Sequence, residues 1–231
     1  MRDRRSARRL RAALWRRSFV WQWRGWRRAL RDFALVQLGF FIFGISINLV
    51  VNANLGTAPW LALDAAIARL LGLTLGRTII LTSVLVIIAD LALGQALGWG
   101  TLANMLCIGL WTDGLKPLVP LPPPALWAQL AYVLVSVALL GLGTALYVGV
   151  HAGAGPRDSL MLAVARRLRV GVQSARLGID VAVVVLALLL GGSVGIGTLI
   201  VALTTGPAIQ LCFRLLRVTP QPPAPAPNPE G

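Results

Sequence analysis

Charged side chains interrupt a long apolar sequence at one stretch, HAGAGPRD, which runs from His151 to Asp158. A charged side chain at bilayer depth is costly unless it is paired or hydrated. Arg157 could therefore bind an anionic group or pair with a carboxylate. Asp158 is placed to cap the following helix and to favour its dipole. The other reading is a solvated external loop, in which Arg157 has no partner and Asp158 only caps.

A second polar break lies 97 residues upstream, where residues 54–60 read NLGTAPW. The same offset aligns GWGT at 98–101 with GIGT at 195–198. A fixed offset shared by many glycines indicates a duplicated structural unit. We therefore predict two equivalent helix breaks, formed by Gly56 and Pro59 in the first copy and by Gly153, Gly155 and Pro156 in the second.

Polar residues in and near the two breaks are the candidate solute-binding side chains. They are Arg157, Asp158, His151, Asn52, Asn54 and Asp64. His151 either faces a cavity as a proton-sensitive group or bonds to a neighbouring helix. A single histidine without a Cys/His cluster predicts no metal site. The sequence has no nucleophile triad, paired carboxylates or phosphate loop, so we expect neither an enzyme nor a cofactor.

Two aspartates lie inside apolar segments away from the breaks. Asp180 follows Arg176 by four residues, which predicts an ion pair on one helix face. Asp90 has no cation near it in the sequence and is predicted to be a buried carboxyl group. Cys107 and Cys212 are predicted to be buried free thiols, because no pattern of cysteine spacing suggests a disulfide framework.

The composition predicts a polytopic membrane protein. Hydrophobic residues make up 57% of the 231 positions and charged residues 13%, and the mean hydropathy is +0.75. Apolar runs near the ~20 residues that span a bilayer recur along the chain. Residues 1–31 supply +11 of the net charge of +14. A basic arm before a hydrophobic span favours anionic lipid headgroups over nucleic acid as its partner.

The spacing of Trp15, Phe19, Trp23 and Trp26 predicts an amphipathic helix over 10–31, with a disordered tail as the alternative. Short apolar segments at 60–71 and 158–169 would be about 18 Å long as helices. A hydrocarbon core is about 30 Å thick, so each segment is either a half-helix or part of a re-entrant hairpin. Longer spans are predicted over 33–51, 78–97, 101–115, 125–150, 176–190 and 199–216.

These segments predict an all-α membrane protein, a bundle of about eight membrane helices, two of them short or broken, built from two tandem four-helix repeats. The divisions are a basic arm at 1–32, a first repeat at 33–115, a proline-rich linker at 116–124, a second repeat at 125–217 and a disordered proline-rich tail at 218–231. The distribution of Lys and Arg favours four crossings per repeat in parallel copies, with both termini cytoplasmic. An inverted three-plus-three arrangement is the alternative.

Residues 39–210 resemble a known family. The sequences GLGTALYVGVHAGAGPRDSLMLA, ARRL and LLLGGSVGIGTLIVALTTGPAIQ are similar to those of the YczE/YyaS/YitT-type bacterial integral membrane proteins. The resemblance implies a multi-pass protein of the bacterial inner membrane and names no substrate. The first copy in that family often reads GxxPWD, whereas Leu61 follows Pro59-Trp60 here and the nearest carboxylate is Asp64.

Two functions follow from this pattern. In the first, the chain is a permease for an unknown small solute, bound where the two Gly-Pro breaks meet. The alternative is a non-transporting scaffold or accessory protein that holds lipids or partner proteins through its glycine-rich faces and basic arm. Homo-oligomerisation stays open under both hypotheses.

Overall fold

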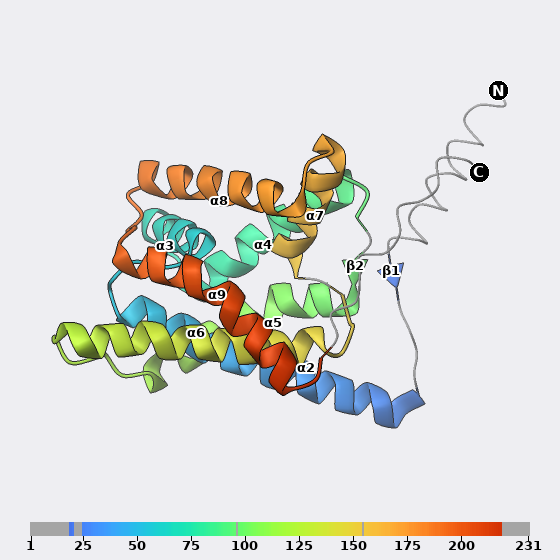
Figure 1. The fold of residues 1–231 in the computed structure, drawn as a ribbon, viewed down its shortest axis with the longest axis horizontal. Helices are drawn as coiled ribbons and strands as arrows, with labels where there is room; N and C mark the ends of the chain where they lie inside the picture. The colour runs from blue at the N-terminus through green and yellow to red at the C-terminus, as the bar shows by residue number, and fades with distance from the viewer. Residues whose placement is uncertain (1–18, 21–24, 96, 154, 219–231) are drawn as a thin grey trace.

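The computed structural model describes residues 19–20, 25–95, 97–153 and 155–218, which form a bundle of helices (Figure 1). Its α-helices are α2 (Gly25–Asn52), α3 (Pro59–Leu71), α4 (Leu75–Ala92), α5 (Trp99–Leu115), α6 (Leu126–Val148), α7 (Pro156–Leu168), α8 (Val172–Leu189) and α9 (Ile196–Leu215). Every predicted helical segment after the basic arm has its counterpart among these eight, with ends shifted by up to eight residues.

Five described helices are long and apolar enough to cross a membrane: α2, α4, α6, α8 and α9. Helix α5 has 17 residues. Helices α3 and α7 have 13 residues each, about 20 Å, so neither spans a hydrocarbon core alone. Both begin with a proline, which is favoured in the first helical turn because its fixed φ suits the helix and its missing N–H is not needed there.

The basic arm differs from the predicted helix where the structure describes it. Phe19–Val20 form the short strand β1, which pairs in parallel with β2 (Leu97–Gly98). Helix α2 begins at Gly25 and continues without interruption into the first span. Residues 1–18, 21–24 and 219–231, which include most of the predicted arm and tail, lie outside the described residues. In the linker, Lys116–Leu118 form a 3-10 turn, η1.

The backbone repeats itself at the 97-residue offset. Helices α3 and α7 match at both ends, as do α4 and α8. Left-handed residues also occur in matched pairs: Asn54 with His151, Gly56 with Gly153, Gly72 with Arg169, and Gly94 with Gly191. In the first of these pairs, two non-glycine residues share a conformation that side chains rarely adopt.

Helices α2 and α6 form the central contact and run in opposite directions (Figure 1). A Cβ built on Gly39 would lie 2.9 Å from the carbonyl oxygen of Gly143, so the two backbones touch there. Further along, the Ser46 hydroxyl donates to the carbonyl of Ser136 over 2.7 Å. The parallel arrangement favoured by the sequence is therefore wrong for these two helices.

The other helix contacts also come in equivalent pairs, with one exception. Helix α2 packs on α5 where Gly44 meets Trp111, and α6 packs on α9 where Gly141 meets Ala208 at the same offset. Helix α3 packs on α8 as α7 packs on α4. Only the last pair differs among the described residues: α4 packs along α5, whereas α8 and α9 are barely in contact.

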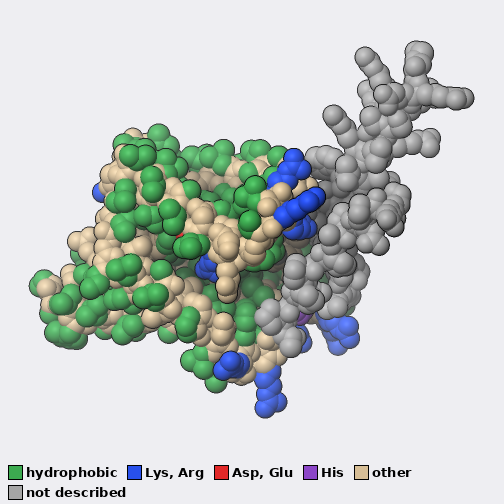
Figure 2. All heavy atoms as spheres, turned by 45° about the horizontal axis from the view of Figure 1, so that its top comes forward, with side chains coloured by type: hydrophobic (Ala, Val, Ile, Leu, Met, Phe, Trp, Pro, Cys, Tyr) green, Lys and Arg blue, Asp and Glu red, His purple; other side chains and the backbone are tan. Residues whose placement is uncertain are grey.

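Basic residues are concentrated at one end of the bundle, where α2 begins, α7 joins α8 and α9 ends (Figures 1 and 2). That end holds Arg27, Arg28, Arg31, Arg166, Arg167, Arg169, Arg176, Arg214 and Arg217, whereas the opposite end holds Arg69, Arg77 and Lys116. We call these the basic end and the opposite end. The surface between them is mainly apolar, as expected of a protein solvated by lipid.

Candidate functional site

Two side chains bring the starts of the short helices α3 and α7 into contact. The guanidinium carbon of Arg157, at the start of α7, lies 5.0 Å from the ring centroid of Trp60, at the start of α3. These residues occupy equivalent positions, 97 residues apart. The first turns of α3 and α7 are thus joined through these two side chains, whereas Gly56 and Gly153 of the two predicted breaks contact Gly195 and Gly98.

A buried ion pair joins the two short helices. Arg157 Nη2 donates to Asp64 Oδ2 over 2.6 Å, and the hydroxyl of Thr82 on α4 donates to Asp64 Oδ1 over 2.7 Å. The Asp64 side chain is fully buried, and that of Arg157 is 29% exposed. Arg157 was expected either to bind an anionic group or to pair with a carboxylate, and in the structure it pairs with a carboxylate. Its charge is then compensated, which weakens the case for a bound anion.

Each break is fixed to the glycine turn of the other half. The amide of Gly197 donates to the carbonyl of Leu55 over 2.7 Å, and the amide of Gly100 donates to that of Ala152 over 2.9 Å. The two bonds are equivalent at the 97-residue offset. The glycines of GWGT and GIGT thus allow close backbone approach. Their turns serve packing between the halves, and the same amides are not free to hold an anion.

A second polar cluster lies where α7 begins. Gly155 is the N-cap residue of α7 and offers no side-chain cap; Asp158 therefore does not cap the helix and lies in its first turn instead. A Cβ built on Gly155 would lie 3.4 Å from Asp158 Oδ2, 3.4 Å from Tyr147 Oη and 3.5 Å from Asn104 Nδ2. Three polar atoms from α7, α6 and α5 thus converge on one point. Asp158 itself is exposed.

The pair predicted on α8 forms as expected. Arg176 Nε lies 3.7 Å from Asp180 Oδ2, on a helix that packs against α7.

Three of the predicted site residues have other surroundings. Asn52 Nδ2 donates to the carbonyls of Val119 and Pro120, over 3.0 and 3.1 Å, and so fixes the end of α2 to the proline-rich linker. Asn54 is exposed in a left-handed turn. His151, its equivalent, is also exposed and left-handed. These residues shape the breaks without joining the Asp64–Arg157 pair.

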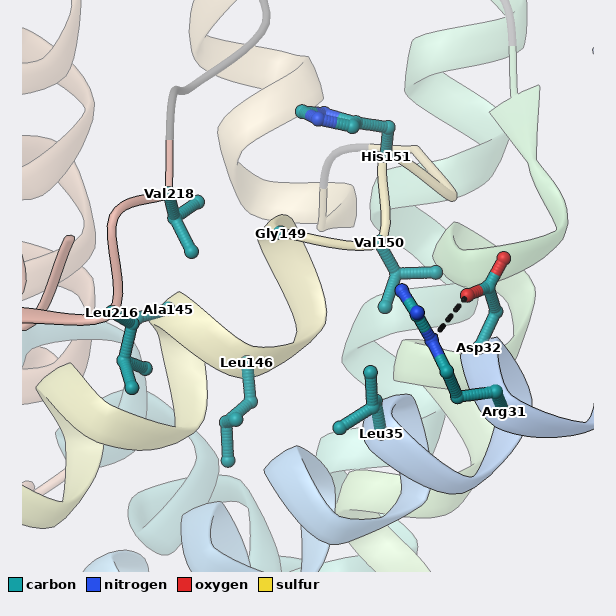
Figure 3. A pocket seen from close by; sticks show the side chains of 10 residues that line it. All are labelled: Arg31, Asp32, Leu35, Ala145, Leu146, Gly149, Val150, His151, Leu216 and Val218. Carbon is teal, nitrogen blue, oxygen red and sulfur yellow. Dashed lines mark ion pairs between the residues drawn. The ribbon is translucent and has the colours of Figure 1, made fainter. Parts of the chain in front are cut away.

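His151 does line a cavity, as one hypothesis required, but that cavity lies away from the Asp64–Arg157 pair. The cavity has a volume of about 320 Å³ and lies at the basic end, between the start of α2, the end of α6 and residues 216–218. Arg31 and Asp32 line it as well, and Figure 3 shows the imidazole turned away from that ion pair. The cavity shares no lining residue with the Asp64–Arg157 pair.

Asp90 is buried, as predicted, and neither of its carboxyl oxygens has a hydrogen-bond partner among the described residues. A carboxylate in such surroundings is costly, and the neutral acid is the form that the site favours. Neither oxygen pairs with Arg157, whose partner is Asp64. Asp90 is therefore separate from the ion pair at Arg157.

Sequence reasoning missed two residues at the Asp64–Arg157 pair, Trp60 and Thr82, and it missed Tyr147 in the second polar cluster. The offset contained a usable signal for Trp60, because it is the equivalent of Arg157 and both occupy the second position of a short helix. The sequence contained no comparable signal for Thr82 or Tyr147. Each lies in a long apolar helix, and only the packing of that helix brings its hydroxyl to the site.

Comparison with known proteins places the chain among membrane proteins. A model described as a family of unknown function (DUF6198) matches residues 30–214. The chain is 33% identical over 195 residues to an uncharacterized protein of Haemophilus influenzae. The aligned residues make up 84% of this chain and 89% of that protein.

Two Bacillus subtilis proteins are also similar. They are the uncharacterized membrane protein YczE, 32% identical over 75% of this chain and 80% of its own length, and the uncharacterized protein YyaS, 30% identical over 71% and 83%. No solved structure matches. These relatives confirm the resemblance to YczE and YyaS: the chain is a membrane protein and belongs to DUF6198, a family of unknown function.

Proposed function

We propose that this protein is a small-solute permease made of two inverted repeats, and that its central site opens to one side of the membrane at a time. One observation carries the proposal. The pair α4–α5 is closed, whereas the equivalent pair α8–α9 is open, although the other equivalent helix pairs pack alike. An asymmetry confined to one pair of contacts is what alternating access between related halves requires.

Inverted repeats account for the direction of the helices and for the charges together. Each repeat contributes three crossings, α2, α4 and α5 or α6, α8 and α9, while its break and short helix form a re-entrant segment. The antiparallel packing of α2 and α6 supports this arrangement. By the positive-inside rule, the basic end is cytoplasmic. The first and last described helices both have their outer ends there, which agrees with a bacterial inner-membrane protein whose termini are cytoplasmic.

A specific latch closes the α4–α5 pair at the opposite end. A Cβ on Gly76 would lie 2.1 Å from the carbonyl oxygen of Gly109, so the two helices touch through their backbones. The carboxylate of Asp113 accepts a hydrogen bond from the amide of Gly76 over 2.8 Å and another from the hydroxyl of Thr74. This contact seals the path from the outside.

The equivalent latch on α8 and α9 is not made. Gly206 corresponds to Gly109, and nothing lies within 4 Å of a Cβ built on it. Gln210 corresponds to Asp113 and is exposed, as are Gly171 and Gln173, which correspond to Thr74 and Gly76. The cytoplasmic side of the central site is thus the open side in this arrangement.

In the proposed cycle, the closed pair α4–α5 opens and the open pair α8–α9 closes. Helix α8 would close on α9 through Gly206, and α4 would separate from α5 when Asp113 releases the start of α4. The short helices α3 and α7 then act as the common centre, joined by the Asp64–Arg157 pair. A scaffold has no use for one open and one closed copy of the same helix pair, so the packing favours the permease over that alternative.

Paired cysteine labelling tests this proposal without a known substrate. In a variant lacking Cys107 and Cys212, a single cysteine replaces either Ile80, which packs beside Gly109, or its equivalent Leu177. A membrane-impermeant maleimide should label Leu177→Cys from the cytoplasmic side and leave Ile80→Cys protected. Adding Asp113→Asn should make Ile80→Cys reactive from the outside. Protection at both positions, with and without Asp113→Asn, would mean a sealed scaffold.

A substitution at Gly206 tests the second state. Leu has open space at this position now but would collide with α8 once the pair closes. We expect Gly206→Leu to fold normally, to keep the labelling of Leu177→Cys, and to abolish the outside labelling of Ile80→Cys produced by Asp113→Asn. Gly178→Leu is the matched control, because that glycine is equally open and lies on α8. Outside labelling that persists in Gly206→Leu contradicts the proposed exchange.

A further inference from the structure

Asp90 is a buried acid that takes no part in the Asp64–Arg157 pair. It lies in the last turn of α4 and is fully buried. Both carboxyl oxygens are shielded from solvent, and neither has a hydrogen-bond partner among the described residues. An ionised carboxylate is strongly destabilised in such surroundings, whereas the neutral acid has no charge to compensate. The position therefore suits a carboxyl group together with its proton.

The other half of the protein shows that packing does not need an acid at this position. The equivalent residue is Ala187, on α8, which is also fully buried. It lies in a small apolar cluster with Ala62 and Leu63 of α3. Helix α4 packs on α7 as α8 packs on α3, so Asp90 occupies the place of a small apolar side chain. An acid where alanine suffices points to binding, and the simplest ligand of a lone buried carboxylate is a proton.

The charged and titratable side chains around α4 are engaged elsewhere. Helix α4 packs on α3, α5 and α7. Asp64 and Arg157 pair with each other, and Asp113 binds Gly76 at the start of α4, about 21 Å of helix away from Asp90. The others on these four helices are exposed or bonded to other groups: Arg69, Arg77, Cys107, Asp158, Arg166 and Arg167. None of these described side chains forms a hydrogen bond with the Asp90 carboxyl group.

We propose that Asp90 binds and releases a proton in each cycle of the permease, and that the proton leaves only after α4 has moved. This role rests on the proposed permease function, because α4 is the helix that separates from α5 in the proposed cycle. On release, the O–H bond of the acid breaks, its electron pair stays on the Asp90 oxygen, and a water molecule takes the proton. The carboxylate cannot return to its buried, unpartnered surroundings until it takes up a proton again. Loss of the proton therefore favours the arrangement in which α4 has left α5.

Infrared spectroscopy of the full-length protein, purified in detergent at neutral pH, tests whether Asp90 holds a proton. The C=O stretching band of a carboxylic acid is separate from the bands of a carboxylate. We expect this acid band in the difference spectrum of wild type minus Asp90→Asn. Asp90→Ala, which repeats the side chain of the equivalent position, should fold and give the same band. Asp32→Asn is the control, because Asp32 pairs with Arg31 and should lose a carboxylate band instead. A carboxylate band in the Asp90 difference spectra overturns the proposal.

Cysteine labelling as a function of pH tests the link between the proton and α4. The outside labelling rate of Ile80→Cys is measured with and without Asp90→Asn, in the variant without Cys107 and Cys212. Asp113→Asn is also present, because it gives a measurable rate and removes the other acid that could release α4.

The comparison runs from about pH 6 to about pH 9, and the ratio of the two rates cancels the pH dependence of the thiol itself. We expect the ratio of the rate with Asp90 to the rate with Asp90→Asn to rise with pH, by at most about tenfold per pH unit for one proton. Equal pH profiles of the two proteins overturn the proposal.

The two measurements also separate this proposal from the permease function. An acid band at Asp90 in a protein whose Ile80→Cys and Leu177→Cys both stay protected at every pH would overturn the permease and leave Asp90 as the proton site of a sealed protein. Outside labelling of Ile80→Cys with the same pH profile in Asp90→Asn would overturn the coupling to the proton and leave the permease standing.

Discussion

Asp64→Asn is expected to lower the free energy of unfolding by about 3 kcal/mol, the low end of the range for breaking a buried ion pair. The low end applies because Asp64 is fully buried while Arg157 keeps 29% of its side-chain surface exposed. The substitution leaves a guanidinium group between α3 and α7 without its counter-charge. It also replaces the acceptor of the Thr82 hydrogen bond by an amide. Denaturation of the purified protein in detergent measures the effect.

A double-mutant cycle with Arg157→Gln separates the pair from other losses. If the pair is a coupled unit, removing both charges should cost less than the sum of the single changes. Asp32→Asn is the matched control, since Asp32 meets Arg31 at 3.8 Å beside an Arg side chain that is 76% exposed. Such a pair contributes about 0.5 kcal/mol or less. Strict additivity of Asp64→Asn and Arg157→Gln would contradict the coupling of the two short helices.

Gly98→Ala is expected to destabilise the protein by about 3 kcal/mol or to prevent accumulation of folded protein. Its Cβ would lie 2.0 Å from the carbonyl oxygen of Ala152, which accepts the amide of Gly100 in the contact between the halves. Backbone atoms on both sides leave no flexible side chain to move. Folded yield and Tm in detergent report the change.

Two further variants show whether the loss comes from that contact. Gly114→Ala, within α5, meets nothing within 4 Å and should be neutral or stabilising by about 0.5–1 kcal/mol. Gly195→Ala, the equivalent of Gly98→Ala, would approach the carbonyl of Leu55 at 2.5 Å and should be harmful in the same way. If Gly98→Ala were as mild as Gly114→Ala, the close contact between the break and the turn would not exist.

Most of the helices could be predicted from the sequence, because apolar length and the placement of Gly and Pro are local signals. The short helices lie close to where they were expected, but Pro59 and Pro156, which were predicted as parts of the breaks, are their first residues. The direction in which each helix runs through the membrane was harder to predict. A 13-residue apolar segment can be a crossing or a re-entrant half-helix, and counting it as a crossing reverses every later helix. The antiparallel contact between α2 and α6 supports the re-entrant half-helix.

The candidate site could be predicted in part, for the same reason. Arg157 and Asp64 stood out because charges are rare in apolar sequence, and the structure brings them together. His151, Asn52 and Asn54 were also polar residues near a break. In the structure, however, His151 and Asn54 are exposed, and Asn52 bonds to the proline-rich linker. Nearness in sequence to a break does not fix the side to which a residue points. Tertiary packing alone supplies Thr82 and the Tyr147 hydroxyl.

The inverted relation of the two halves is the claim on which the open and closed sides depend, and single-cysteine sidedness tests it most directly. Arg77 and Ser174 are equivalent positions at the starts of α4 and α8, and both are exposed. In the variant without Cys107 and Cys212, an impermeant maleimide should label Ser174→Cys from the cytoplasmic side and Arg77→Cys from the outside. Labelling of both positions from the same side would contradict the account.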